Sequence, residues 1–101
     1  MKVYTVHAQH KFDYDFSVEQ TNHGCFKNEI DAINALKKVA AAIKKTHKYS
    51  MKEYSNKEDY PDEDNGALYI EEDNRIFYMC FGYQEDRESH TAWIDEWEVK
   101  E

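Results

Sequence analysis

The sequence predicts an α+β fold in which one long amphipathic helix packs on an antiparallel sheet of about five strands. Three patterns predict this class: polar and apolar residues alternate in the first third, a helical apolar stripe follows, and strand-like segments fill the last third. The expected order of elements is β-β-α-β-β-β. With 101 residues, of which 41% are hydrophobic and 15% aromatic, the chain has the size and composition of one domain spanning residues 1–101.

The first segment alternates as a half-buried strand does. One face is formed by Tyr4, Val6, Ala8 and Phe12. Residues 13–15 then turn the chain into a weaker strand that runs towards Phe26. We expect a hairpin that places Ala8 opposite Gln20 and Thr5 opposite His23.

The helix is predicted over residues 28–47. Asn28 is a favourable N-cap residue, and acidic residues follow it while lysines gather in the second half, as the helix dipole favours. The apolar stripe consists of Ile30, Ile33, Leu36, Ala40 and Ile43. The polar residues 48–66 are expected to form a loop with about one helical turn.

The C-terminal third predicts a meander of three strands. A two-residue turn at Asp73-Asn74 would place Leu68 opposite Met79 and Ile70 opposite Phe77. The strand over residues 75–83 is expected to be central. A loop over 84–89 leads to a last strand over 91–99, where Asp95 interrupts the phase of the two tryptophans and suggests a β-bulge.

Charge and cysteine content narrow the class of partner. The net charge is −8, which repels phosphate backbones and therefore disfavours direct nucleic-acid binding, so the expected partner is a basic protein. The N-terminus lacks a signal-peptide pattern, and no apolar run approaches the ~20 residues that cross a bilayer. Two distant cysteines, Cys25 and Cys80, indicate free thiols. These features predict a cytoplasmic protein without membrane contact.

Two motifs suggest chemistry. Gly66 aligns with the glycine of an EF-hand loop, but Pro61 then occupies the first ligand position, so a solvated acidic turn is favoured. His23-x-Cys25, with His7, His90 or Cys80 as companions, suggests a metal-dependent or thiol-dependent protein. A second closely spaced ligand pair is missing from the sequence. We keep this as the alternative function.

Enzymatic activity is not expected. The sequence has no nucleophile elbow, phosphate-cradling glycine loop or dinucleotide fingerprint, and no cofactor is predicted. A third interpretation uses the basic helix face to contact nucleic acid or an acidic partner, but a solvated helix face is favoured there. The lysines of this face are Lys37, Lys38, Lys45 and Lys48.

Acidic residues interleave with large aromatic residues, a pattern that suggests a protein-binding surface. Tyrosine and tryptophan are effective interface anchors, and carboxylates complement lysine- and arginine-rich surfaces. The simpler interpretation, which is favoured for scattered surface charge, places the aromatics in the core and the acids in solvent. The predicted partner-binding residues are Asp62, Glu63, Asp64, Tyr69, Glu71, Glu72, Asp73 and Tyr83.

Three segments carry a resemblance to known proteins. Residues 1–6, the helix start at 28–32 and the closing residues 93–99 together resemble small uncharacterised proteins of bacteria and their phages, a group that implies no shared activity. In size and charge the chain is also similar to phage inhibitors of the anti-CRISPR type, some of which mimic DNA, and to immunity proteins. We therefore predict a non-enzymatic inhibitor that blocks the basic nucleic-acid-binding surface of a defence protein or nuclease.

Overall fold

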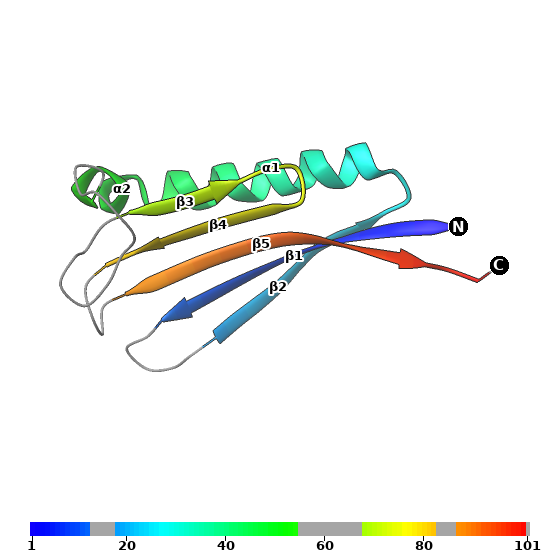
Figure 1. The fold of residues 1–101 in the computed structure, drawn as a ribbon, viewed down its shortest axis with the longest axis horizontal. Helices are drawn as coiled ribbons and strands as arrows, with labels where there is room; N and C mark the ends of the chain where they lie inside the picture. Colours follow the sequence, from blue (N-terminus) through cyan, green and yellow to red (C-terminus); the bar gives the residue numbers. More distant parts are fainter. Residues whose placement is uncertain (13–17, 55–67, 83–86, 101) are drawn as a thin grey trace.

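Five antiparallel strands form one twisted sheet, and the helix α1 runs along one of its faces (Figure 1). The computed structural model describes residues 1–12, 18–54, 68–82 and 87–100. The elements are β1 (Lys2–Phe12), β2 (Val18–Phe26), α1 (Glu29–Thr46), α2 (Lys48–Tyr54), β3 (Tyr69–Glu72), β4 (Ile76–Phe81) and β5 (Glu88–Glu98). Their order in the sheet is β2-β1-β5-β4-β3. The predicted α+β class and the long packed helix are confirmed.

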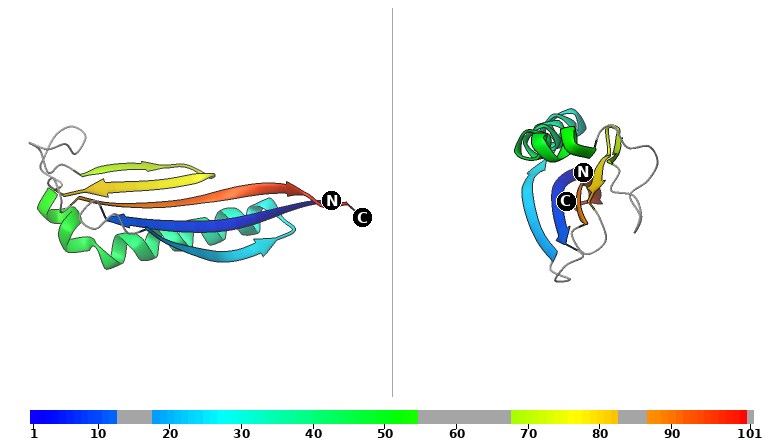
Figure 2. Two further views of the ribbon diagram at one scale, coloured as in Figure 1. Left: turned by 90° about the horizontal axis from the view of Figure 1, so that it is seen from below. Right: turned by 90° about the vertical axis from the view of Figure 1, so that its left-hand side faces the viewer.

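The core lies between α1 and the face of the sheet that α1 covers. Figure 2 shows both helices on the same side of the strands. Alternate residues of β1, β4 and β5 point towards α1 and form the strand side of the core. The largest fully buried side chains are Phe77, Leu36, Met79 and Val6. The other face of the sheet, which we call the open face, is not covered by either helix.

The predicted limits of α1 are confirmed to within one residue. The Asn28 side-chain oxygen accepts the Ile30 backbone N–H at 2.8 Å, which satisfies one of the amides left free at a helix start. At the other end the His47 backbone N–H donates to the Ile43 carbonyl at 3.1 Å. Residues 48–54 form α2, and the rest of the predicted 48–66 loop lies outside the described residues.

The predicted apolar stripe is wrong at one position. Ile30 is 66% exposed, whereas Ala32 is fully buried. Ile30 precedes Leu36 by six residues, which rotates it by about 120° from the centre of the buried face. The other four members of the stripe belong to the core or pack against it.

The predicted register of the first hairpin is also wrong. Ala8 pairs with Thr21 instead of Gln20, and an irregularity between Thr5 and His7 shifts the pairing so that Thr5 lies opposite Cys25. A slip of one residue exchanges the two faces of a strand. Thr21 therefore shares the helix-facing side with Ala8. Gly24, with φ of 128°, adopts the left-handed conformation that this irregularity needs.

The turn between β3 and β4 lies one residue later than predicted. Asp73 pairs with Ile76, and its carboxylate accepts the backbone N–H groups of Arg75 at 2.7 Å and Ile76 at 2.9 Å. The two-residue loop is therefore Asn74-Arg75. Ile70 lies opposite Met79 and not opposite Phe77. Because the register moves by two positions, the predicted apolar face of this hairpin is retained.

The last strand is longer and more regular than predicted. It begins at Glu88, and its pairing with β1 runs without interruption from Lys2↔Glu98 to Phe12↔Glu88, so the predicted bulge at Asp95 is absent. Asp95 lies on the open face together with both tryptophans. A carboxylate is tolerated on this uncovered face, so the alternation of the strand continues through Asp95 without a bulge. β5 is the middle strand, while β4, predicted to be central, lies between β5 and β3. Within the described residues no helix is long and apolar enough to cross a membrane.

Candidate metal centre

Three histidines and one glutamate gather between the sheet and the end of α1, at the end of the molecule away from the two termini (Figure 1). His10 of β1 lies directly opposite His90 of β5. Glu88 precedes His90 by two residues and therefore points to the same face. His47 is the C-cap residue of α1. The cluster thus depends on one pair of neighbouring strands and one helix end.

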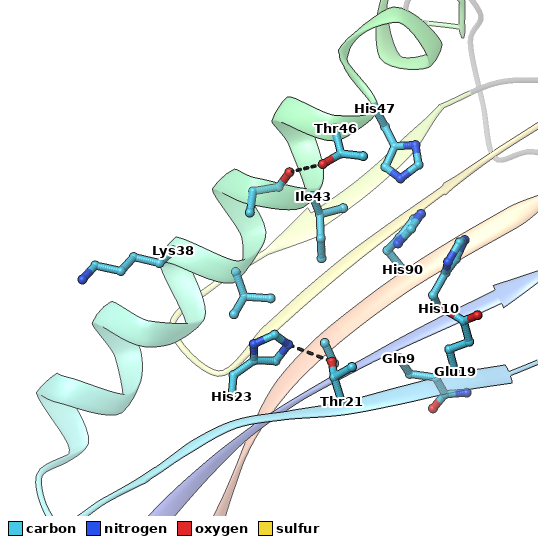
Figure 3. A pocket seen from close by; sticks show the side chains of 13 residues that line it. Gln9, His10, Glu19, Thr21, His23, Lys38, Ile43, Thr46, His47 and His90 are labelled. Carbon is cyan, nitrogen blue, oxygen red and sulfur yellow. Dashed lines mark hydrogen bonds between the residues drawn. The ribbon is translucent and has the colours of Figure 1, made fainter.

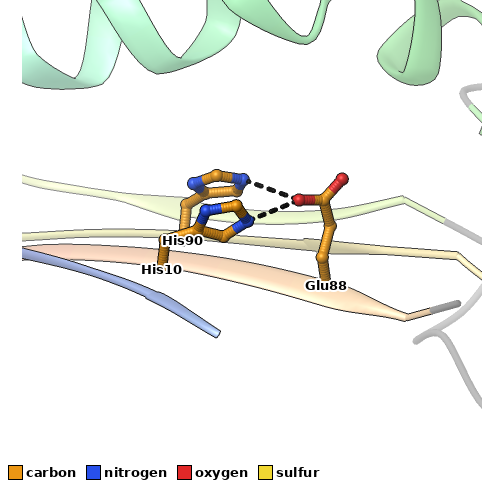
Figure 4. A group of neighbouring side chains, drawn as sticks. All are labelled: His10, Glu88 and His90. Atoms are coloured by element: carbon orange, nitrogen blue, oxygen red, sulfur yellow. Dashed lines mark hydrogen bonds and ion pairs between the residues drawn. The ribbon is translucent and has the colours of Figure 1, made fainter. Parts of the chain in front are cut away.

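The carboxylate of Glu88 lies against two imidazole rings (Figure 4). His10 Nε2 is 2.6 Å from Glu88 Oε2. Because an ionised carboxylate only accepts, the ring N–H of His10 is the donor. His90 Nε2 lies 3.3 Å from the same oxygen, at ion-pair distance but without the geometry of a hydrogen bond. Glu88 therefore accepts a hydrogen bond from the His10 ring and lies near the His90 ring without accepting one.

His90 is the unusual member of the cluster. It is 6% exposed and is the one buried polar residue of the described core. Its Nε2 atom is buried without a hydrogen-bond partner, a state that among the described residues is shared only with side-chain atoms of Arg87. Buried polar groups are normally paired, because an unpaired one costs roughly 1–3 kcal/mol. The orphaned Nε2 therefore needs an explanation.

A bound metal ion would explain this nitrogen. One donor atom from each of His10, Glu88 and His90 lies within 4.8 Å of the others. Tetrahedral zinc ligands, at about 2.0–2.2 Å from the metal, lie roughly 3.4 Å from one another. For one ion to bind all three donors, the two stacked rings, whose planes are 17° from parallel, would have to turn so that both nitrogens point at the ion. Two histidines and one carboxylate are a donor set for zinc in hydrolases and for non-haem ferrous iron.

Aromatic rings surround the cluster. His10 and His90 stack with ring centroids 4.0 Å apart, and the His47 ring centroid lies 4.4 Å from that of His90. Phe12 packs at 4.1 Å from the His10 ring and Phe81 at 5.6 Å from the His47 ring. His47 Nδ1 is 4.0 Å from the other Glu88 oxygen, Oε1. His47 therefore lies beside the cluster but outside the group of three donors.

Burial shapes the protonation of the cluster. It lowers the pKa of His47, and the neighbouring His90 lowers it further, against the opposing effect of Glu88. Burial would raise the pKa of the Glu88 carboxyl, but the contacts from His90 and His10 and the charge of His47 outweigh it, so this pKa lies below its usual range. Neutral imidazole and ionised carboxylate are the forms that bind metals.

The metal-free protein should lose stability in acid. The lowered pKa of His47 means that the unfolded chain binds the proton more readily, so stability falls as the pH drops below about 6.5, the ordinary histidine value. Glu88 acts with the same sign at lower pH, because folding favours its ionised form. Chemical unfolding at pH 7.5 and 5.5 measures the first effect. His47→Gln should reduce the difference between the free energies of unfolding at the two pH values. An unchanged difference in that variant would contradict the assignment of this effect to His47.

A cavity of about 480 Å³ opens beside the cluster, between α1 and the strands β1 and β2 (Figure 3). His10, His47 and His90 line one end of it. Its length is walled by α1 on one side and by alternate residues of β1 and β2 on the other. Thr21 and His23 stand at the far side, with Thr21 Oγ1 and His23 Nε2 2.8 Å apart. The volume is in the range of small-ligand sites.

The predicted partner-binding residues do not form this site. Asp62, Glu63, Asp64 and Tyr83 lie outside the described residues. The other four occupy β3 and the turn after it, where Glu72 pairs with Lys44 and Asp73 accepts turn amides. The Tyr69 hydroxyl donates to Glu71 Oε2 at 3.3 Å. All three of these carboxylates therefore have contacts within the chain, and the carboxylate-surface hypothesis stays a prediction.

The structure separates the predicted metal ligands. His23 lines the cavity, while Cys25 is exposed and Cys80 is buried. No third donor joins His23 and Cys25 in the metal-type groupings of the described residues. Sequence reasoning missed Glu88 because residues 84–89 were assigned to a loop. The pattern Glu88-x-His90, two ligands on one face of a strand, was the available signal.

None of the family models, curated proteins and solved structures compared with the chain matches it. The resemblances suggested by the sequence therefore remain predictions. The functional argument accordingly depends on the site itself.

Proposed function

We propose that the protein binds one divalent transition-metal ion through His10, Glu88 and His90, with His47 beside them. The observation that carries this proposal is the Nε2 atom of His90, buried and unpartnered, next to a carboxylate and a second imidazole. Metal coordination would satisfy this nitrogen and offset the buried charge of Glu88. Zinc and ferrous iron fit the donor set best.

The sheet holds these donors in place before any metal arrives. His10 and His90 are a directly opposed pair of β1 and β5, and Glu88 is held at ion-pair distance from both. Ligands on rigid strands need little ordering when the ion binds, which favours affinity. In the metal-free protein the His10 ring N–H donates a hydrogen bond to Glu88. Metal coordination at Nε2 must therefore displace this proton, either to Nδ1 of the same ring or to solvent.

The experiment is a calorimetric titration of metal-free, untagged protein with Zn²⁺, repeated with Fe²⁺ under anaerobic conditions and with Mg²⁺. We expect one site per chain for zinc or iron. Mg²⁺, which prefers oxygen ligands in octahedral geometry, should give no heat. Absence of a stoichiometric site for both transition metals would contradict the proposal.

A second candidate function, the predicted protein-binding module, is favoured by the open face of the sheet. Trp97 is 52% exposed, and its Nε1 donates to Thr5 Oγ1 at 2.8 Å. Trp93 Nε1 donates to Asp95 Oδ2 at 3.1 Å, and His7 stacks on the Trp93 ring. An exposed, oriented tryptophan beside a carboxylate is a typical interface anchor. We therefore propose this acidic and aromatic surface as the contact for a basic protein.

Substitutions on the open face should weaken such an association. Trp97→Ala removes the anchor, and Asp95→Lys reverses the charge beside it, so both should reduce capture of a basic partner from lysate at low salt. Asp31→Lys, an exposed charge reversal on α1, is the matched control. High salt should abolish capture by the unchanged protein. Capture that is insensitive to salt and to both open-face substitutions would contradict this second candidate function.

A further inference from the structure

The cavity and the metal centre share three residues. His10, His47 and His90 line the end of the cavity, whereas Glu88 is not part of its lining. A metal ion held by His10, Glu88 and His90 would therefore have Glu88 on one side and the cavity on the other. Three protein ligands leave a zinc ion with an open coordination position. The position not taken by the protein would face the cavity.

The rest of the cavity has an apolar wall and a polar one. Val39, Ala42 and Ile43 of α1 form most of the apolar wall, with Ala8 of β1. The polar wall is on β2, where Glu19, Thr21 and His23 line the cavity and Thr21 and His23 are within hydrogen-bond distance of each other. Figure 3 shows the Lys38 side chain directed away from the cavity. A ligand would therefore find apolar surface along the helix and polar contacts at the histidine end and along β2.

Charge decides the kind of polar group at the histidine end. A divalent ion together with the Glu88 carboxylate leaves a net positive charge at the ion, and the imidazoles that bind the ion are neutral. Glu19 also lines the cavity and lies opposite His10, but it is exposed, so water and salt screen its charge. An anionic donor would neutralise this charge in surroundings of low dielectric constant. Carboxylate is a common zinc ligand. The apolar wall then accommodates the chain of the same molecule.

On the basis of the proposed metal centre, we infer that the cavity binds a small amphipathic carboxylate. The carboxylate occupies the open position of the metal, and the apolar chain lies along α1 beside Ala42 and Ile43. This assigns a ligand class to the cavity. In this assignment the metal ion holds the carboxylate of the ligand in place.

The test titrates zinc-loaded protein with octanoate and compares it with metal-free protein. Butanoate shortens the apolar chain, and 1-octanol removes the carboxylate. We expect octanoate to bind the zinc-loaded protein at least about 10-fold more tightly than butanoate does, because each buried methylene contributes about 0.8 kcal/mol. 1-Octanol should bind the zinc-loaded protein at least about 10-fold more weakly than octanoate does. Octanoate should bind metal-free protein at least about 10-fold more weakly than it binds zinc-loaded protein. Equal affinity of octanoate with and without zinc would overturn the inference.

A pair of helix substitutions locates the ligand. Ala42→Phe places a large ring in the cavity and should weaken octanoate binding at least about 10-fold, the cost of excluding two methylenes. Ala41→Phe, at the neighbouring exposed position outside the cavity lining, is the matched control and should leave octanoate affinity unchanged. Both variants should keep the zinc affinity of the unchanged protein. Equal octanoate binding by the two variants would overturn the inference.

The two proposals fail in different ways. If zinc does not bind, the direct zinc titration shows it, and both the metal centre and the ligand assignment are wrong. If zinc binds with one site per chain but octanoate does not, the ligand assignment alone is wrong. Octanoate binding that needs zinc and is lost in Ala42→Phe supports both.

Discussion

Replacing His90 with glutamine should weaken zinc binding by more than about 100-fold. His90 supplies one of three closely placed donors and is almost fully buried. Substitution of residues that only orient metal ligands typically lowers metal affinity by about 10–100-fold. Loss of a ligand should therefore lower the affinity further. Competition with a chromophoric chelator measures the affinity of the variant and of the unchanged protein.

Controls separate metal loss from unfolding. His7→Gln changes a histidine on the open face, where His7 Nε2 lies 2.9 Å from Thr5 Oγ1, and should leave zinc affinity unchanged. Because His90 lies in the core, circular dichroism must first show that His90→Gln folds. His10→Gln and Glu88→Gln, at less buried positions, are parallel tests with the same expected loss. Unchanged zinc affinity in all three cluster variants would contradict the ligand assignment.

Phe77→Ala should lower the free energy of unfolding by about 3–5 kcal/mol, the usual effect of removing a buried phenylalanine. Phe77 is fully buried on β4, among the core residues that face α1. Domains of this size are stable by only about 5–15 kcal/mol, so the variant should lose a large part of its stability. Denaturant unfolding followed by circular dichroism gives the difference.

The matched control is Ile30→Ala. Ile30 is 66% exposed, and surface substitutions usually change stability by less than about 0.5 kcal/mol. The two variants remove apolar side chains, one from a buried and one from an exposed position. A similar loss in both, or a small loss in Phe77→Ala, would contradict the placement of the core between α1 and β4.

Periodicity predicted the elements of this fold well, because it depends only on local sequence. The alternation from Tyr4 to Phe12 and the helix after Asn28 are both present. Periodicity did not settle where strands pair. The side-chain contacts of Asp73 place the β3–β4 turn one residue beyond the predicted Asp73-Asn74 pair. Such contacts compete with simple turn preferences.

The candidate metal centre was less accessible to sequence reasoning. It requires His10 and His90 to be directly opposed, although they lie 80 residues apart in the chain. It also requires β5 to begin at Glu88, where charged neighbours suggested a loop. Sequence spacing instead drew attention to His23 and Cys25, which are close along one strand but lack a third donor among the described residues. Only the strand register brings the actual cluster together.

The most direct test of the metal centre is a crystal structure of zinc-loaded protein with anomalous diffraction recorded at the zinc absorption edge. We expect one anomalous peak between β1 and β5, about 2.0–2.1 Å from a ring nitrogen of both His10 and His90 and about 2.0–2.2 Å from a Glu88 oxygen. A fully loaded crystal with no peak there, or with zinc bound only at other residues, would contradict the proposed function.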